Sequence, residues 1–300
     1  MAHTPVLLKE VLEYLDPKPG QFIIDGTVNR GGHTTAILKK MMPSGKYLAV
    51  DLDENILENT KSEINSKFQI PNSTFEIVWQ NDNYANIPEI LKRKEMGKAD
   101  GLLVDLGFSS AQIENSNRGF SFQKNEPLDM RYDIVQKLMA HDVVNKYSEK
   151  ELADIIWKFG EERFSRRIAK KIIEERAKEP IVNTFQLVEV IKMAVPRSYE
   201  KGRIHPATRT FQALRIFVND ELGNLEKLLK NLDFILNRDG RAVIISFHSL
   251  EDRIVKNYFK EMKQSKKVEL LTKKPITATE EEIRLNPRSR SAKLRAIKII

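Results

Sequence analysis

The fold of this chain is decided by residues 22–33, FIIDGTVNRGGH. A short apolar run ends on Asp25, and a turn that contains Gly31 and Gly32 leads from it into a helical pattern. A strand, a glycine turn and a helix in this order are typical of the first unit of a parallel α/β sheet. The glycines allow close approach of the backbone, and the start of the helix offers N–H donors to a ligand.

The same alternation continues along the chain. Further strands are predicted at 46–51, 75–79 and 101–105, with amphipathic segments near 34–42, 54–66 and 86–96. Alternation of this kind favours right-handed βαβ units in a parallel sheet. The strand pattern resumes late in the chain, at 241–246, 268–271 and 294–299.

A helical block interrupts the alternation. Residues 148–179 read as helix, with Ser148 and Glu151 in the spacing of a capping box. Helices are also expected at Thr184–Ala194 and from about 208 to 236. We therefore expect an α/β domain formed by 1–112 and 210–300, and an inserted helical domain at 113–209 that recognises substrate.

Acidic residues end three of the predicted strands: Asp25, Asp51 and Asp105. Ligands of open parallel sheets bind at the carboxyl ends of the strands. An acid ending the second strand suits ribose hydroxyls, and neither G-x-G-x-x-G nor a P-loop is present. The pattern indicates a nucleoside cofactor without pyrophosphate. S-adenosylmethionine fits, because carboxylates suit its cationic groups.

Two simpler interpretations stay open for this region. Residues 22–33 also fit an ordinary βα turn. Residues 81–84, Asn-Asp-Asn-Tyr, follow the third strand where an adenine pocket is expected, with Tyr84 as a stacking ring, but they also fit a polar strand-end loop.

Composition narrows the class of protein. The last hundred of the 300 residues hold 22 basic and 12 acidic side chains, which fits either a polyanionic partner, with RNA the leading candidate, or a solvated, lysine-rich surface. The absence of cysteine excludes disulfides, zinc-thiolate sites and a cysteine nucleophile, and fits a cytoplasmic protein. No signal peptide, membrane span or metal-ligand spacing is apparent.

Longer motifs in the sequence resemble those of a known protein family. The chain resembles the ribosomal RNA small-subunit methyltransferase H family, also called MraW. The resemblance covers nearly the whole chain and rests on HTPVLL (3–8), DLGFSSAQI (105–113), NRGFSF (117–122), PLDMR (127–131), GEERF (160–164), HPATRTFQALR (205–215), SFHSLEDR (246–253) and NPRSRS (286–291).

The resemblance implies a class I Rossmann-like methyltransferase domain, with a mostly parallel seven-stranded sheet, and a helical insert. It also implies methylation of the exocyclic N4 of a cytidine in the decoding region of 16S ribosomal RNA. By motif matching, the contacts to S-adenosylmethionine fall on Gly31, Gly32, His33, Asp51, Tyr84, Asp105 and Gln112. Asn29 stands where the family usually has glycine, and asparagine tolerates positive φ well.

The chemistry at the target follows partly from the residues. Methylation of cytosine at C5 normally needs a cysteine thiolate, which this chain lacks. An exocyclic amine attacks the methyl group directly when acceptors hold its protons, and Asp105 is our candidate catalytic acceptor. The target base must be splayed out, stacked and read on its edge.

Candidates for substrate contact are Phe247 and His248 after the fifth strand, Asp129 and Arg131, and the basic residues Arg288, Arg290, Lys293 and Arg295. His248 also fits a satisfied strand-end histidine. His141 and His205 do not lie at predicted strand ends, and a purely structural role is the favoured interpretation for both. A second group of cations fits either a solvated helix face or RNA backbone contact: Arg163, Arg166, Arg167, Lys170 and Lys171.

Two other functions stay open: a methyltransferase for a small molecule or protein, and a non-catalytic RNA-binding protein with a methyltransferase fold. The expected partner is small-subunit ribosomal RNA, within an assembled or assembling subunit. The oligomeric state is open, a homodimer included.

Overall fold

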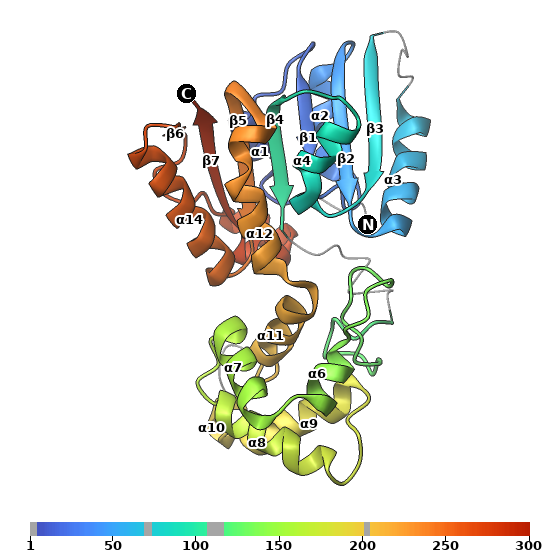
Figure 1. Cartoon of the computed structure of the whole chain (residues 1–300), viewed down its shortest axis with the longest axis vertical. Coiled ribbons are helices and arrows are strands. Elements are labelled where there is room, and N and C mark those ends of the chain that lie inside the picture. The colour runs from blue at the N-terminus through green and yellow to red at the C-terminus, as the bar shows by residue number, and fades with distance from the viewer. Residues whose placement is uncertain (1–4, 69–73, 107–116, 201–204) are drawn as a thin grey trace. The chain divides into compact units, whose positions relative to one another are not determined.

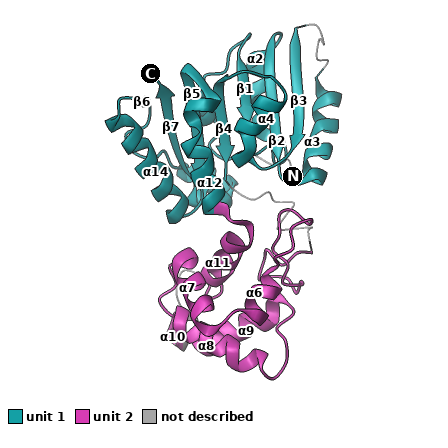
Figure 2. Cartoon of the chain, viewed as in Figure 1, with its two compact units in different colours: residues 1–107, 222–300 teal, residues 108–221 magenta. Residues whose placement is uncertain are grey.

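The protein is described from a computed structural model that covers residues 5–68, 74–106, 117–200 and 205–300. The chain divides into two compact units, residues 1–107 with 222–300, and residues 108–221 (Figure 2). In the parts of the chain that the structure describes, no helix is long and apolar enough to cross a membrane.

The first unit is built on a seven-stranded sheet in the order β3-β2-β1-β4-β5-β7-β6 (Figure 1). Strands β1 to β5 pair in parallel, and β7 runs antiparallel to both β5 and β6. The mostly parallel sheet expected from the sequence is confirmed. The strands are β1 (Phe22–Asp25), β2 (Gly45–Asp51), β3 (Phe75–Asn81), β4 (Ala99–Asp105), β5 (Leu236–Ser246), β6 (Val268–Leu270) and β7 (Lys293–Ile299).

Alternate residues of the strands contribute to two separate hydrophobic cores, because successive side chains of a strand point to opposite faces of the sheet. Ile24 and Leu102 belong to the core under α4 and α12–α14, whereas Ile23 and Leu103 belong to the core under α1–α3. Helices therefore cover both faces of the sheet, as in doubly wound folds.

The helices of this unit are α1 (Leu8–Leu15), α2 (Gly32–Met41), α3 (Glu54–Lys67), η1 (Tyr84–Asn86), α4 (Ile87–Arg93), α12 (Glu221–Lys230), α13 (Leu232–Ile235), α14 (Ser249–Gln264), α15 (Glu280–Leu285) and η2 (Pro287–Ser291).

The second unit is helical and has its own core, to which Ile156, Ile168, Ile191 and Leu214 contribute. The capping box at Ser148 is present, since Ser148 N–H donates to Glu151 and Ser148 Oγ accepts from Glu151 N–H. The helices are α6 (Ala140–Lys146), α7 (Glu149–Gly160), α8 (Ser165–Arg176), α9 (Thr184–Ala194), α10 (Arg197–Glu200) and α11 (Thr208–Asn219).

Two long helices expected from the sequence are wrong. The stretch 148–179 breaks into α7 and α8 because Glu161 adopts a left-handed conformation, φ 50°. The stretch 208–236 breaks at Asp220, φ 46°, where α11 ends. Since the division between units follows this second break, α11 belongs to the helical unit, and the boundary expected at 209/210 lies too early.

Candidate functional site

Three carboxylates end three neighbouring strands. Asp25 is the last residue of β1, Asp51 of β2 and Asp105 of β4, and the sheet order places β1 between the other two. All three pairings among these strands and β5 are parallel, so the acids meet at one edge of the sheet. This is the carboxyl edge at which open parallel sheets bind ligands.

The loop after β1 reaches across this edge to β2. Asn29 N–H donates to Asp51 Oδ2 at 2.8 Å, and Asn29 O accepts a hydrogen bond from Thr60 Oγ1 at 2.9 Å. Asn29 has a φ of 49°, so it adopts the left-handed region, which asparagine tolerates better than most residues. The loop is thus held by β2 and α3 before α2 begins.

The two glycines that follow are required by protein neighbours. Gly31 has a φ of 69°, and a Cβ on it would lie 2.5 Å from Thr60 Cγ2. A Cβ on Gly32 would lie 2.5 Å from Pro5 Cγ. Packing against Thr60 and Pro5 is enough to explain why these two positions lack a side chain. The glycines are therefore not evidence of space for a ligand, and that role stays a prediction.

Asp25 is fully buried and serves the loop. Its carboxylate accepts hydrogen bonds from Thr27 N–H at 3.1 Å, from Thr34 Oγ1 at 2.9 Å and from Tyr47 OH at 3.0 Å. Burial raises the pKa of Asp25, and the hydrogen bond from Thr27 partly offsets that rise. The structure thus corrects the expectation of a direct cofactor contact: Asp25 anchors the turn from inside the protein.

Asp51 faces the edge with part of its hydrogen-bonding capacity in use. Its two oxygens accept from Asn29 N–H and from Asp53 N–H, at 2.8 and 2.9 Å. Burial raises the pKa of Asp51 to about 6, and these two bonds oppose the rise. A carboxylate accepts about four hydrogen bonds, so Asp51 keeps room for hydroxyl donors.

Asp105 lies beside His33 at the third position. Thr27 Oγ1 accepts a hydrogen bond from Asp105 N–H at 2.6 Å, and Asp105 Oδ2 lies 3.7 Å from His33 Nδ1. His33 Nε2–H donates to Val6 O at 2.9 Å, which fixes the ring. The structure therefore brings His33 and Asp105 together, whereas Gln112 lies outside the described residues.

Tyr84 comes from the loop after β3 and lies next to the same edge. Asp82 N–H donates to Asp51 O at 3.1 Å, and Asn83 accepts from Ala85 N–H as it starts η1. A Cβ on Gly26 would lie 3.2 Å from Tyr84 Cβ. The loop thus places a half-buried aromatic side chain beside the turn that follows β1.

The substrate candidates divide between the two units. Phe247 follows β5 and packs against the core under α1–α3, while His248 caps α14, accepting from Glu251 N–H at 3.4 Å. His248 is therefore a strand-end histidine with a structural task. In the other unit, Arg131 forms a two-pronged ion pair with Asp129, at 2.7 and 2.9 Å, so the pair holds its own segment together.

The basic C-terminal candidates also divide. Arg288 and Arg290 are exposed on η2. Arg295 is only 8% exposed and lies 2.6 Å from Asp252, which Lys293 also contacts at 3.4 Å. The expectation that Arg295 contacts RNA is wrong, because Arg295 is buried against a carboxylate of α14. Lys293 is partly exposed, and its contact with RNA stays a prediction.

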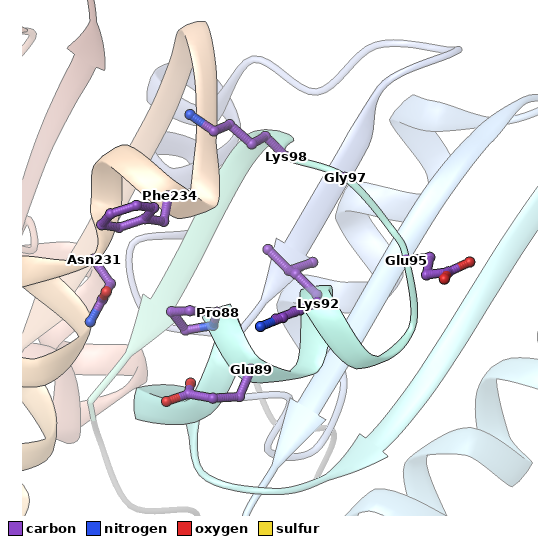
Figure 3. Close-up of a pocket in the computed structure, with 9 residues that line it drawn as sticks. Pro88, Glu89, Lys92, Glu95, Gly97, Lys98, Asn231 and Phe234 are labelled. Carbon is purple, nitrogen blue, oxygen red and sulfur yellow. The ribbon is translucent and has the colours of Figure 1, made fainter.

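A separate cleft of about 650 Å³ lies at the other end of β4. Its side chains come from α4, the turn before β4 and α13, among them Pro88, Lys98 and Phe234 (Figure 3). Since Asp105 ends β4 and Lys98 precedes it, this cleft is separate from the edge at which the three acids lie.

Sequence reasoning missed the residues that support the acids. Thr27, Thr34, Tyr47 and Thr60 hold Asp25, Asp105 or the loop by hydrogen bonds. Hydroxyl residues are common in the strands, loops and helices of any α/β protein, and nothing in their spacing sets these four apart.

The sequence profile of the MraW methylase family matches residues 1–300. The chain is 44% identical to ribosomal RNA small subunit methyltransferase H of Clostridioides difficile, with 98% of this chain and 97% of that protein aligned. It is 46% identical to the protein of the same name from Acidobacterium capsulatum, with 98% and 97% aligned. A solved rRNA methylase from Streptococcus thermophilus aligns over 98% of this chain and 93% of its own, with a TM-score of 0.44 and 10% identity. The chain therefore belongs to the MraW methylase family.

Proposed function

We propose that this protein methylates the exocyclic N4 of a cytidine in the decoding region of 16S ribosomal RNA. Family membership supplies the coarser statement: the chain is a ribosomal RNA methyltransferase, and S-adenosylmethionine is its methyl donor. The observation that carries the finer proposal is Asp105, a carboxylate beside His33 at the edge where β1, β2 and β4 end.

The residues at this edge fit the cofactor. Among the residues that the structure describes, no lysine or arginine forms an ion pair with Asp51, so its negative charge stays available to a cationic ligand. Asp51 is proposed to accept the ribose hydroxyls and Tyr84 to stack on the adenine, with Gly31, Gly32 and His33 lining the turn. When bound, S-adenosylmethionine supplies an electrophilic methyl group on sulfur.

Asp105 is proposed to act on the target amine. The nitrogen lone pair of a cytosine amino group is conjugated with the ring, so the amine attacks only when an acceptor turns that lone pair toward the methyl group. The Asp105 carboxylate would accept one N–H and take that proton when N4 gains the methyl group, while the bound donor would lose its methyl–sulfur bond and leave as a neutral thioether. Thr27 fixes the backbone of Asp105 by a hydrogen bond, and the neighbouring His33 ring places a polar group beside the carboxylate.

Other groups are proposed to hold the RNA. Phe247 follows β5, which pairs with β4, so it lies near the same edge and is our candidate for stacking on the splayed base. Exposed Arg288 and Arg290 are proposed to contact phosphates. Asp129 and Arg131 are proposed to stabilise the conformation of their own segment, since the two side chains form an ion pair with each other.

Methyl transfer to small ribosomal subunits, followed by nucleoside mass spectrometry, tests this proposal. We expect N4-methylcytidine from the wild-type protein, and a methylated adenosine or a 2′-O-methyl nucleoside would overturn the assignment. The variant Asp105→Ala should lose methyl transfer while calorimetry still detects binding of S-adenosylmethionine. Asp233→Ala, which removes a carboxylate from α13, is the matched control; near-normal methylation by Asp105→Ala would refute the role of Asp105.

A further inference from the structure

The helical unit contains a cleft of about 470 Å³ between α7 and α8. Trp157 lines it from α7, Arg163 from the turn between the helices, and Arg166 and Arg167 from the first turn of α8. Every lining residue belongs to the same unit, so the cleft is complete within it. It is also separate from the acids of β1, β2 and β4.

The turn that carries Arg163 is fixed by a buried carboxylate. Glu162 is fully buried and accepts hydrogen bonds from Phe164 N–H at 2.8 Å and from Tyr199 OH at 2.7 Å. The rings of Phe164 and Tyr199 meet edge to face, with 5.1 Å between their centroids. The Arg163 guanidinium lies over both rings, at 4.8 and 5.2 Å, so the cleft is preorganised.

The arginines of the cleft carry positive charge that the protein does not neutralise. Within the described part of the chain, no carboxylate lies at ion-pair distance from Arg163, Arg166 or Arg167, and all three are exposed. Lys171, farther along the same helix, is paired with Glu175 at 2.8 Å. The cleft is therefore lined by three guanidinium groups that have no carboxylate partner among the described residues, and Asp154 contributes the one carboxylate of its lining.

Trp157 adds an aromatic surface to this charge. Its side chain is 59% exposed, although indole rings are normally well buried. An exposed ring among guanidinium groups is the combination that binds single-stranded nucleic acid: the ring stacks on a base, and the cations contact the flanking phosphates.

We propose that this cleft binds a single-stranded segment of the substrate RNA, with one base on Trp157 and adjoining phosphates on Arg163, Arg166 and Arg167. The inference rests on the proposed function, since it takes RNA as the substrate. The cleft would act on affinity for RNA and leave the methyl-transfer step itself unchanged.

The chain provides its own reporter for this contact. It has two tryptophans, so Trp79→Phe leaves Trp157 as the only one. We expect a short oligouridylate to quench the emission of Trp157 in the full-length Trp79→Phe protein. Arg166→Gln and Arg167→Gln should weaken this binding and each lower the salt slope by about 0.7. In the otherwise wild-type chain, Trp157→Ala should weaken binding of a labelled oligouridylate about tenfold, measured by fluorescence anisotropy.

Lys170→Gln is the matched control, because Lys170 is an exposed cation of α8 that does not line the cleft. Unchanged Trp157 emission and unchanged anisotropy with Trp157→Ala would overturn the inference, as would an equal loss from Lys170→Gln. Quenching by polyglutamate in place of oligouridylate would assign the cleft to an acidic protein instead.

Methyl transfer separates this inference from the proposed function. If the cleft variants raise KM for small ribosomal subunits while kcat is kept, both stand. If they methylate N4 of cytidine with the wild-type KM, the cleft inference fails alone. If the wild-type protein forms no N4-methylcytidine, the proposed function fails, whatever the oligouridylate titration shows.

Discussion

The carboxyl group of Asp51 should make cofactor binding depend on pH in a range where most aspartates do not titrate. Its pKa is raised from 3.8 to about 6, chiefly because the group is buried at the end of β2. Ribose hydroxyls donate to the ionised form much better than to the protonated one. Acidification therefore removes the form of Asp51 that we propose binds S-adenosylmethionine.

The size of the effect follows from the pKa. If only ionised Asp51 binds, the apparent Kd of the cofactor stays nearly flat above pH 7 and rises about tenfold at pH 5. The raised pKa of Asp51 affects folding stability in the opposite direction, since ionisation of this group lowers the free energy of unfolding. Because the folded-state pKa is raised, the contribution of Asp51 to stability is present below pH 3.8 and is lost as pH rises through about 6, by about 3 kcal/mol in all.

Isothermal titration of S-adenosylmethionine between pH 5 and pH 8 measures this dependence. The variant Asp51→Asn should bind weakly but with little change across the range, because it has no group that titrates at position 51. A wild-type Kd that is constant through pH 6 would refute the reasoning. An Asp51→Asn variant that keeps the tenfold loss would do so as well, since a group other than Asp51 would then carry the titration.

Two further changes test the packing around the site. Gly31→Ala should lower the free energy of unfolding by about 2 kcal/mol, because φ is 69° and the new Cβ meets Thr60 Cγ2. In a Thr60→Ser background, which lacks that methyl group, thermal unfolding should show a smaller cost. An equal cost in both backgrounds would contradict the contact. Arg295→Ala should cost about 3 kcal/mol, because it leaves the Asp252 carboxylate buried without its main partner. A melting temperature unchanged by Arg295→Ala, together with weaker RNA binding, would restore Arg295 as an RNA contact.

The sheet was predictable because its signals are local. Each strand of the first half is a short apolar run that ends on a polar residue, and Asp25, Asp51 and Asp105 mark the three ends that meet. The helical unit was harder, since its breaks fall at Glu161 and Asp220, which adopt the left-handed conformation although neither position holds the glycine that usually marks it.

Individual site residues were harder still, because sequence shows the type of a side chain but not its partner. His248 occurs in a quoted motif and Arg295 in the basic C-terminal region, yet the fold gives His248 a helix start to cap and Arg295 a buried carboxylate to neutralise. Both partners, Glu251 and Asp252, come from α14. A basic residue on an inner strand of the sheet has to be paired, whereas Arg290, on the exposed η2, does not.

The three acids at the edge are chemically alike, and their hydrogen bonds assign them different tasks. Asp25 receives three protein donors and is fully buried, so it holds the turn. Asp51 receives two donors out of about four that a carboxylate accepts, which leaves two for a pair of ribose hydroxyls. Since one of its two donors is the backbone of Asn29, the loop after β1 is fixed by the same carboxylate that we propose binds the cofactor. We therefore expect occupation of the proposed ribose site and order in this loop to be coupled through Asp51.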